Sequence, residues 1–227
     1  YSTDANILGL THEAGELEDL TTPARRIDPG MGVFPEDAPQ EPEIFTVRFE
    51  KGLPVSINGN RVDAYEALEQ SNAIGGKNGI GIGLHTVENR FVGIKSRGVY
   101  EAPGMELLGQ CYEYLLQLII DRRARKLYAP ISEYIAEQIY QGYWFDIATQ
   151  ASMKFVDHLN QLATGTIAVS LYKGGISFHS ASDVPHSLYS EDTASMEAIG
   201  DFDHRDSEGF LGVLGVGARV LNTSGQV

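Results

Sequence analysis

The sequence predicts an α+β domain in which a mostly antiparallel sheet packs with several helices. Short stretches alternate between apolar and polar residues, as strands with one buried face do, and tight-turn signals such as Lys51-Gly52 separate them. Longer segments between these stretches place apolar residues at helical spacing. Strands joined by tight turns pair antiparallel, because a parallel pair needs a long crossover connection.

Two hairpins and one further strand are predicted from the alternation. The first hairpin covers residues 45–57, and its turn is at Lys51-Gly52. The second covers residues 165–179, with its turn at Gly174-Gly175. The further strand is expected over residues 90–95.

Helices are predicted where apolar residues recur every three to four positions. We expect them over residues 63–74, from Pro103 onward, and over 132–141, 147–162 and 193–199, with a last one starting at Asp206. The glycine-dense stretch 75–83 should end the first helix. Tyr143 and Trp144 are expected in the core.

A strong acidic balance limits the classes of partner. The 227 residues include 31 acidic and 17 basic side chains, for a formal charge of −14. A general nucleic-acid binder needs clustered Lys and Arg, and so does a protein that docks on an anionic membrane. We therefore expect no nucleic acid and no membrane as partners.

Cysteine and histidine spacing predicts neither a disulfide nor a metal site. Cys111 is the single cysteine, and no Cys/His set has zinc-ligand spacing. This usage fits a cytoplasmic, reducing compartment. Residues 30–43 carry three prolines among acidic residues, which is typical of an exposed connection that does not pack.

Two sequence blocks carry a family resemblance. Residues 1–13 read Tyr-Ser-Thr-Asp-Ala-Asn-Ile-Leu-Gly-Leu-Thr-His-Glu, and residues 87–104 read Val-Glu-Asn-Arg-Phe-Val-Gly-Ile-Lys-Ser-Arg-Gly-Val-Tyr-Glu-Ala-Pro-Gly. Both resemble the C-terminal synthetase domain of the argininosuccinate synthase family, in the family's order. The resemblance covers residues 1–227, with 211–227 as a candidate extended tail. The family's Ser-Gly-Gly-x-Asp loop, which belongs to a separate N-terminal ATP-binding domain, does not occur in this sequence. We expect further sequence upstream of Tyr1.

The resemblance implies part of an ATP-dependent ligase of arginine biosynthesis. That enzyme joins citrulline and aspartate to give argininosuccinate, AMP and pyrophosphate. ATP and Mg²⁺ are its cofactors, neither of which is expected to bind this chain alone, and it assembles as a homotetramer. The chain alone is then expected to be inactive. The alternatives are a non-catalytic oligomerisation or binding module, or a truncated relic.

Six residues fall on family site positions, none of them a nucleophile. Ser2, Thr11, Glu13, Glu88 and Tyr100 are implied to bind citrulline, and Asp4 to lie near the nucleotide. The residue types suit a zwitterion, since carboxylates make charge-assisted hydrogen bonds to an ammonium group and hydroxyls both donate and accept. Taken singly, each has an ordinary structural explanation, such as a local backbone bond for a hydroxyl or a core position for the tyrosine. The roles of Asn78, Lys95 and Arg97 stay open.

Overall fold

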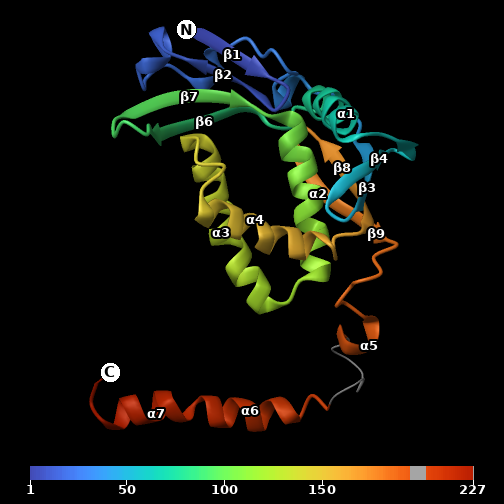
Figure 1. The fold of residues 1–227 in the computed structure, drawn as a ribbon, viewed down its shortest axis with the longest axis vertical. Coiled ribbons are helices and arrows are strands. Elements are labelled where there is room, and N and C mark those ends of the chain that lie inside the picture. Colours follow the sequence, from blue (N-terminus) through green and yellow to red (C-terminus); the bar gives the residue numbers. More distant parts are fainter. Residues whose placement is uncertain (195–202, 227) are drawn as a thin grey trace. The chain divides into compact units, whose positions relative to one another are not determined.

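The computed structural model describes residues 1–194 and 203–226, which belong to two compact units, Tyr1–His186 and Ser187–Val227. The first unit combines two antiparallel sheets with four α-helices (Figure 1). The predicted α+β class is therefore confirmed, although the strands divide between two sheets.

Sheet A contains both sequence blocks that carry the family resemblance. Its strands lie in the order β1 (Ser2–Asn6), β2 (Gly9–Glu13), β7 (Lys95–Glu101) and β6 (Ile82–Asn89). The strand predicted over residues 90–95 is wrong, because residues 90–94 form the turn between β6 and β7. In that turn the Arg90 N–H donates to the Ile94 carbonyl oxygen over 2.8 Å, and Gly93 takes a φ of 90°.

One face of sheet A is covered by the connection from β2 to the next strand. This connection holds three short 3₁₀ helices, η1 (Gly15–Glu18), η2 (Ala24–Arg26) and η3 (Pro35–Asp37). Leu17 and Ile27 pack there with Val99 of β7 in a small buried cluster. The prediction that residues 30–43 do not pack is wrong, since Ala38 is buried and the 31–33 segment contacts Gly76.

Sheet B confirms both predicted hairpins. Its order is β5 (Asn60–Arg61), β4 (Leu53–Ile57), β3 (Glu43–Glu50), β8 (Gly165–Tyr172) and β9 (Gly175–Ser182). The turns at 51–52, 58–59 and 173–174 each pair a positive-φ residue with a positive-φ glycine. Two successive positive φ values match the twist of the flanking strands. The last turn lies one residue earlier than predicted.

The main core lies between sheet B and two helices, α1 (Ala64–Lys77) and α2 (Pro103–Ile119), which also pack on each other. Helix α1 starts at a capping box in which Asp63 and Glu66 exchange hydrogen bonds. It continues through Gly75 and Gly76, where it was expected to end. An added Cβ at Gly76 would lie 1.9 Å from the Met31 carbonyl oxygen, so this glycine serves close packing inside the helix.

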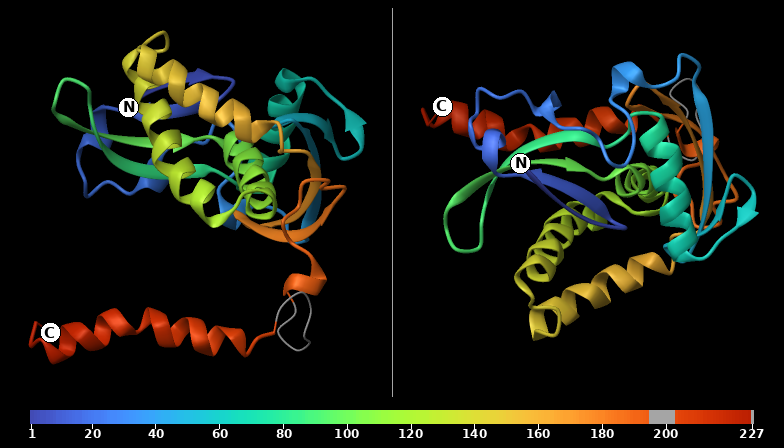
Figure 2. Two further views of the ribbon diagram at one scale, coloured as in Figure 1. Left: turned by 60° about the horizontal axis from the view of Figure 1, so that its bottom comes forward. Right: turned by 90° about the horizontal axis from the view of Figure 1, so that it is seen from above.

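Helices α3 (Arg122–Gln141) and α4 (Ile147–Asn160) form a helical hairpin whose turn contains residues 142–146 (Figure 2). Helix α3 begins ten residues before the predicted 132, because Asp121 caps it and the helix tolerates Pro130. Tyr143 and Trp144 were predicted in the core. That prediction is wrong, since their exposed fractions are 42% and 41%.

The second unit contains α5 (Glu191–Ala194), α6 (Asp206–Leu214) and α7 (Val216–Thr223). The predicted start at Asp206 is confirmed. Of the helix predicted over 193–199, residues 193 and 194 lie in α5, where the Thr193 N–H donates to the Ser190 hydroxyl oxygen. Residues 195–199 lie outside the described residues. Helices α6 and α7 occupy most of the stretch 211–227, where an extended tail was a candidate. Over residues 1–194 and 203–226, none of the helices has the length and apolarity that a membrane span requires.

Candidate small-molecule site on sheet A

Strand register brings all six predicted site residues to one face of sheet A. Ser2 pairs with Glu13 and Asp4 with Thr11 between β1 and β2. Thr11 then pairs with Tyr100 of β7. On the outer strand β6, Glu88 is opposite Ser96, which lies on the same face as Tyr100 four residues later. Directly paired residues share a face, so these six side chains lie on one surface, which we call the site face.

Tyr100 and Glu88 form a direct contact on the site face. The Tyr100 hydroxyl donates to Glu88 Oε1 over 2.7 Å. Burial, followed by this hydrogen bond and the charge of the carboxylate, raises the pKa of the Tyr100 phenol well above its ordinary value. The charges of Glu13 and Tyr140 add to the rise in the Tyr100 pKa. The Tyr100 ring lies over Gly98, where a Cβ would come within 2.6 Å of ring atom Cε2.

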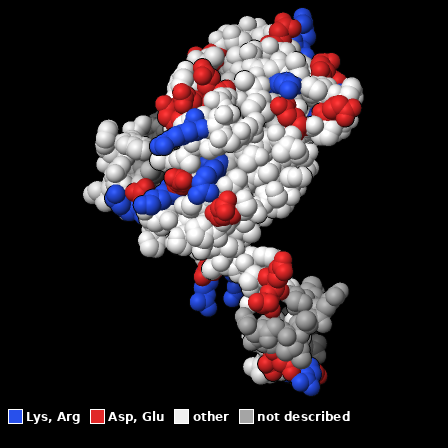
Figure 3. All heavy atoms as spheres, turned by 90° about the vertical axis from the view of Figure 1, so that its right-hand side faces the viewer, with Lys and Arg blue, Asp and Glu red and all other residues white. Residues whose placement is uncertain are grey.

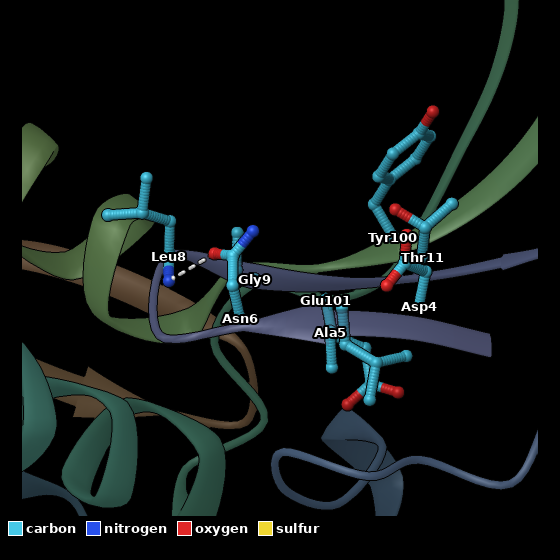
Figure 4. Close-up of a pocket in the computed structure, with 10 residues that line it drawn as sticks. Asp4, Ala5, Asn6, Leu8, Gly9, Thr11, Tyr100 and Glu101 are labelled. Atoms are coloured by element: carbon cyan, nitrogen blue, oxygen red, sulfur yellow. Dashed lines mark hydrogen bonds between the residues drawn. The ribbon is translucent and has the colours of Figure 1, made fainter.

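An open depression of about 280 Å³ lies beside Tyr100 at the β1–β2 turn. Asp4, Thr11 and Tyr100 line it together with Asn6 and Leu8. Figure 4 shows the Tyr100 and Thr11 side chains on one side of the strands and the Glu101 carboxylate on the other. Ser2, Glu13 and Glu88 lie on the site face outside this depression. Three of the six predicted residues thus line the depression, and the other three lie elsewhere on the site face.

The opposite face of sheet A carries a buried pair that the sequence interpretation did not identify. His12 Nε2 and Glu101 Oε1 lie 2.6 Å apart, and both side chains are almost fully buried. The sequence interpretation gave His12 no role, and the structure shows it in a buried hydrogen bond. Glu101 was passed over because nothing near it in the sequence marks a buried carboxylate.

The three residues whose roles were open have structural contacts. Arg97 donates from its guanidinium to the carbonyl oxygens of residues 17, 19 and 22, and so fastens the η1 segment to β7. Lys95 donates to Asn89 Oδ1 across the β6–β7 pair. Asn78 is buried and donates to Glu43 and to a carbonyl oxygen of α1.

The site face is rich in oxygen atoms and poor in positive charge. The lining of the depression contains neither Lys nor Arg. It therefore does not fit a triphosphate by itself, because phosphate groups are held by cations or by clustered N–H donors. In the part of the chain that the structure describes, no group of three His, Cys, Asp or Glu side chains could hold a metal ion. Asp4, whose carboxylate lines the depression, could contribute one oxygen ligand to Mg²⁺.

Charge elsewhere on the first unit is mixed. On the side that carries α1 and β4, Lys and Arg occur in small groups among Asp and Glu (Figure 3). A continuous basic surface of the kind that binds nucleic acid is not seen on that side of the described residues.

The fold and the site face define an α+β domain with a candidate site for a small polar molecule. A family model described as "Arginosuccinate synthase C-terminal domain" matches residues 1–221, so the chain belongs to the argininosuccinate synthase family as its C-terminal domain. The recognition made from the two sequence blocks is confirmed.

Individual relatives agree with this assignment. The chain is 43% identical over 221 residues to the argininosuccinate synthase of Rhodopirellula baltica, covering 97% of this chain and 54% of the relative. It is 41% identical over 220 residues to that of Desulfitobacterium hafniense, strain DCB-2, covering 97% of this chain and 54% of the relative. The chain thus spans about half the length of the curated relatives it matches.

Proposed function

We propose that this chain is the citrulline-binding part of an argininosuccinate synthase, a ligase of arginine biosynthesis that joins citrulline and aspartate at the expense of ATP. The observation that carries the proposal is the site face. Residues from the start of the chain and from strands more than seventy positions later converge there with the donors and acceptors that a zwitterionic amino acid requires.

Each side chain has a role that its chemistry supports. Glu13 and Glu88 accept hydrogen bonds from the citrulline ammonium group, since an ionised carboxylate and an ammonium form a strong pair. The hydroxyls of Ser2 and Thr11 hold the carboxylate or orient the ureido group. Tyr100 contributes an apolar ring beside the ligand and a hydroxyl that is fixed on Glu88.

ATP and aspartate are bound mainly by other parts of the enzyme in this proposal. The depression lacks the cations that phosphates need, and Asp4 is the one described site residue assigned to the nucleotide or its Mg²⁺. This chain's residues hold and orient citrulline, which lowers the barrier by positioning the reactants. We therefore expect no pyrophosphate release when the chain alone is mixed with citrulline, aspartate and MgATP.

A calorimetric titration of citrulline tests the proposal. Glu88→Ala should weaken binding by roughly tenfold or more, because a hydrogen bond to a charged group contributes about 1.5 to 3 kcal/mol. Glu16→Ala is the matched control, since Glu16 lies on η1 and makes an exposed ion pair with Arg26. Equal affinity for the wild type and both variants would remove Glu88 from the site. Complete absence of citrulline binding by the wild type would favour a relic or a non-catalytic module.

A second proposal concerns assembly. We infer that the chain forms a homo-oligomer, a tetramer by family resemblance, through its exposed apolar helical surfaces. At the α3–α4 turn the exposed fractions are 66% for Tyr140, 88% for Phe145 and 91% for Ile147. Exposed apolar side chains grouped in this way are typical of interaction surfaces. Sedimentation should show an oligomer that Phe145→Ser with Ile147→Ser weakens. A wild type that sediments only as a monomer would contradict this proposal.

A further inference from the structure

The buried His12–Glu101 pair crosses sheet A directly behind two site residues. Thr11 and Tyr100 are directly opposite each other on β2 and β7, and both side chains lie on the site face. His12 follows Thr11 and Glu101 follows Tyr100, so both lie on the opposite face. In the register His12 is opposite Val99 and Glu101 opposite Leu10, so the 2.6 Å contact runs diagonally behind the Thr11–Tyr100 pair.

The Glu101 carboxylate is held by three residues at once. Besides the contact with His12, it accepts the Gly30 N–H at 2.9 Å and the Met31 N–H at 2.7 Å. Both N–H groups belong to the connection that covers the opposite face. A fully buried carboxylate is tolerated only when such donors compensate its lost hydration, so each donor constrains where β7 can lie.

The His12 ring is also fixed by its neighbours. Its ring meets the Tyr1 ring edge-on, with centroids 5.5 Å apart, and the Tyr1 hydroxyl in turn accepts the Asp28 N–H. Nδ1 is buried without a hydrogen-bond partner among the described residues. Nε2 therefore carries the proton that the Glu101 carboxylate accepts, because an N–H on Nδ1 would remain unsatisfied.

We propose that His12 and Glu101 are positioning residues for the citrulline site, in that their hydrogen bond fixes β2 against β7 and so sets the separation of Thr11 and Tyr100 on the site face. The assignment to citrulline rests on the function proposed above. The effect on Tyr100 is independent of the proposed function, because the Tyr100–Glu88 hydrogen bond can be measured without a ligand. An error of about 1 Å in such a placement can cost up to roughly 100-fold in function.

Two amide substitutions at position 12 separate positioning from simple burial. In His12→Gln the amide nitrogen takes the place of Nε2 and keeps a donor to Glu101. In His12→Asn the amide nitrogen takes the place of Nδ1 and leaves Glu101 without its side-chain donor. Because Asn is smaller than Gln, His12→Met is the packing control: Met fills the volume of Gln without a donor, so a positioning role predicts that it behaves as His12→Asn does and a role in packing alone predicts that it behaves as His12→Gln does.

The first measurement is the pH titration of Tyr100 by NMR with tyrosine labelled at Cζ, assigned through Tyr100→Phe. We expect Tyr100 to titrate as in the wild type in His12→Gln and nearer to an ordinary tyrosine in His12→Asn, with Glu16→Gln as an unaffected control. The second measurement is calorimetric citrulline affinity, expected to fall roughly 10- to 100-fold in His12→Asn alone.

The outcomes distinguish the two proposals. Wild-type Tyr100 titration and citrulline affinity in a folded His12→Asn variant would overturn the positioning role. If His12→Asn does not fold, His12→Gln decides, because a natively folded Gln variant with an ordinary Tyr100 titration would overturn it as well. The wild type could bind no citrulline while the Tyr100 titration stays as in the wild type in His12→Gln and shifts toward an ordinary tyrosine in His12→Asn. In that case the ligand assignment fails and the positioning of Tyr100 stands.

Discussion

Gly98→Ala should disturb the site face while leaving the fold intact. The new Cβ would lie 2.6 Å from Cε2 of Tyr100, whereas ordinary contacts start at 3.4 Å. The ring must therefore retreat by about 0.8 Å, since the clash is with a side chain that can move. A retreat of that size away from Glu88 lengthens their 2.7 Å hydrogen bond toward about 3.5 Å, where it has lost most of its strength.

The free energy of unfolding should change little, because two effects oppose each other. Losing the hydrogen bond to a partly exposed carboxylate costs about 1 kcal/mol. Replacing glycine by alanine inside a strand contributes about 0.5 to 1 kcal/mol in the other direction. The expected signature is thus a nearly unchanged denaturation midpoint together with an altered site.

The titration of Tyr100 is the decisive assay. The hydrogen bond and the charge of Glu88 help to raise the Tyr100 pKa, so the Tyr100 pKa should fall toward its ordinary value in Gly98→Ala. Gly109→Ala on α2 is the control, because a Cβ there meets no atom within 4 Å. An unchanged Tyr100 titration in Gly98→Ala would refute the reasoning that the ring lies over Gly98 and depends on that space.

Three further predictions concern the scaffold. Gly76→Ala should lower the free energy of unfolding by about 3 kcal/mol, measured by urea titration, because its Cβ meets a backbone carbonyl that cannot retreat as a side chain can. Asp63→Ala removes the capping box of α1 and should lower the free energy of unfolding by about 1 kcal/mol in the same assay, and an unchanged free energy of unfolding would contradict it. The backbone N–H groups of Ala124 and Arg123 lower the pKa of Asp121 from 3.8 in the folded protein. The ionised Asp121 side chain therefore stabilises the folded protein above pH 3.8, and this stabilisation is lost as the pH falls through the lowered pKa of the folded state. Asp121→Asn should therefore flatten the acid limb of the stability curve, whereas parallel curves for both proteins would show that the cap does not titrate as inferred.

Local signals predicted the parts of the fold that local chemistry determines. The hairpin at 45–57 followed from strict alternation together with a Lys51-Gly52 turn that accepts two positive φ values. The stripe of α2 was similarly readable, and Leu107 and Cys111 are indeed buried. In these segments periodicity, turn residues and burial all indicate the same structure, so the sequence alone was sufficient.

The errors arise where distant segments meet. Gly75 and Gly76 were taken as a helix stop because glycine is a poor helix former, but the missing side chain of Gly76 lets the 31–33 segment approach α1, and that of Gly75 lets Pro103 approach it. The 30–43 connection was taken as exposed for its prolines and charges, although it supplies the N–H groups that bind Glu101. Neither contact has a local signature, since each joins residues more than forty positions apart.

The site residues were found through resemblance, while their arrangement follows from strand geometry. On β2 and β7 consecutive residues have opposite functions, because successive side chains of a strand point to opposite faces. Thr11 and Tyr100 lie on the site face, whereas His12 and Glu101 lie on the opposite face and form a hydrogen bond there. Under the proposed function, a substitution at either pair should affect citrulline binding, but by different routes. Changes at Thr11 or Tyr100 should weaken binding without loosening the opposite face, and changes at His12 or Glu101 should do so by moving the strands themselves.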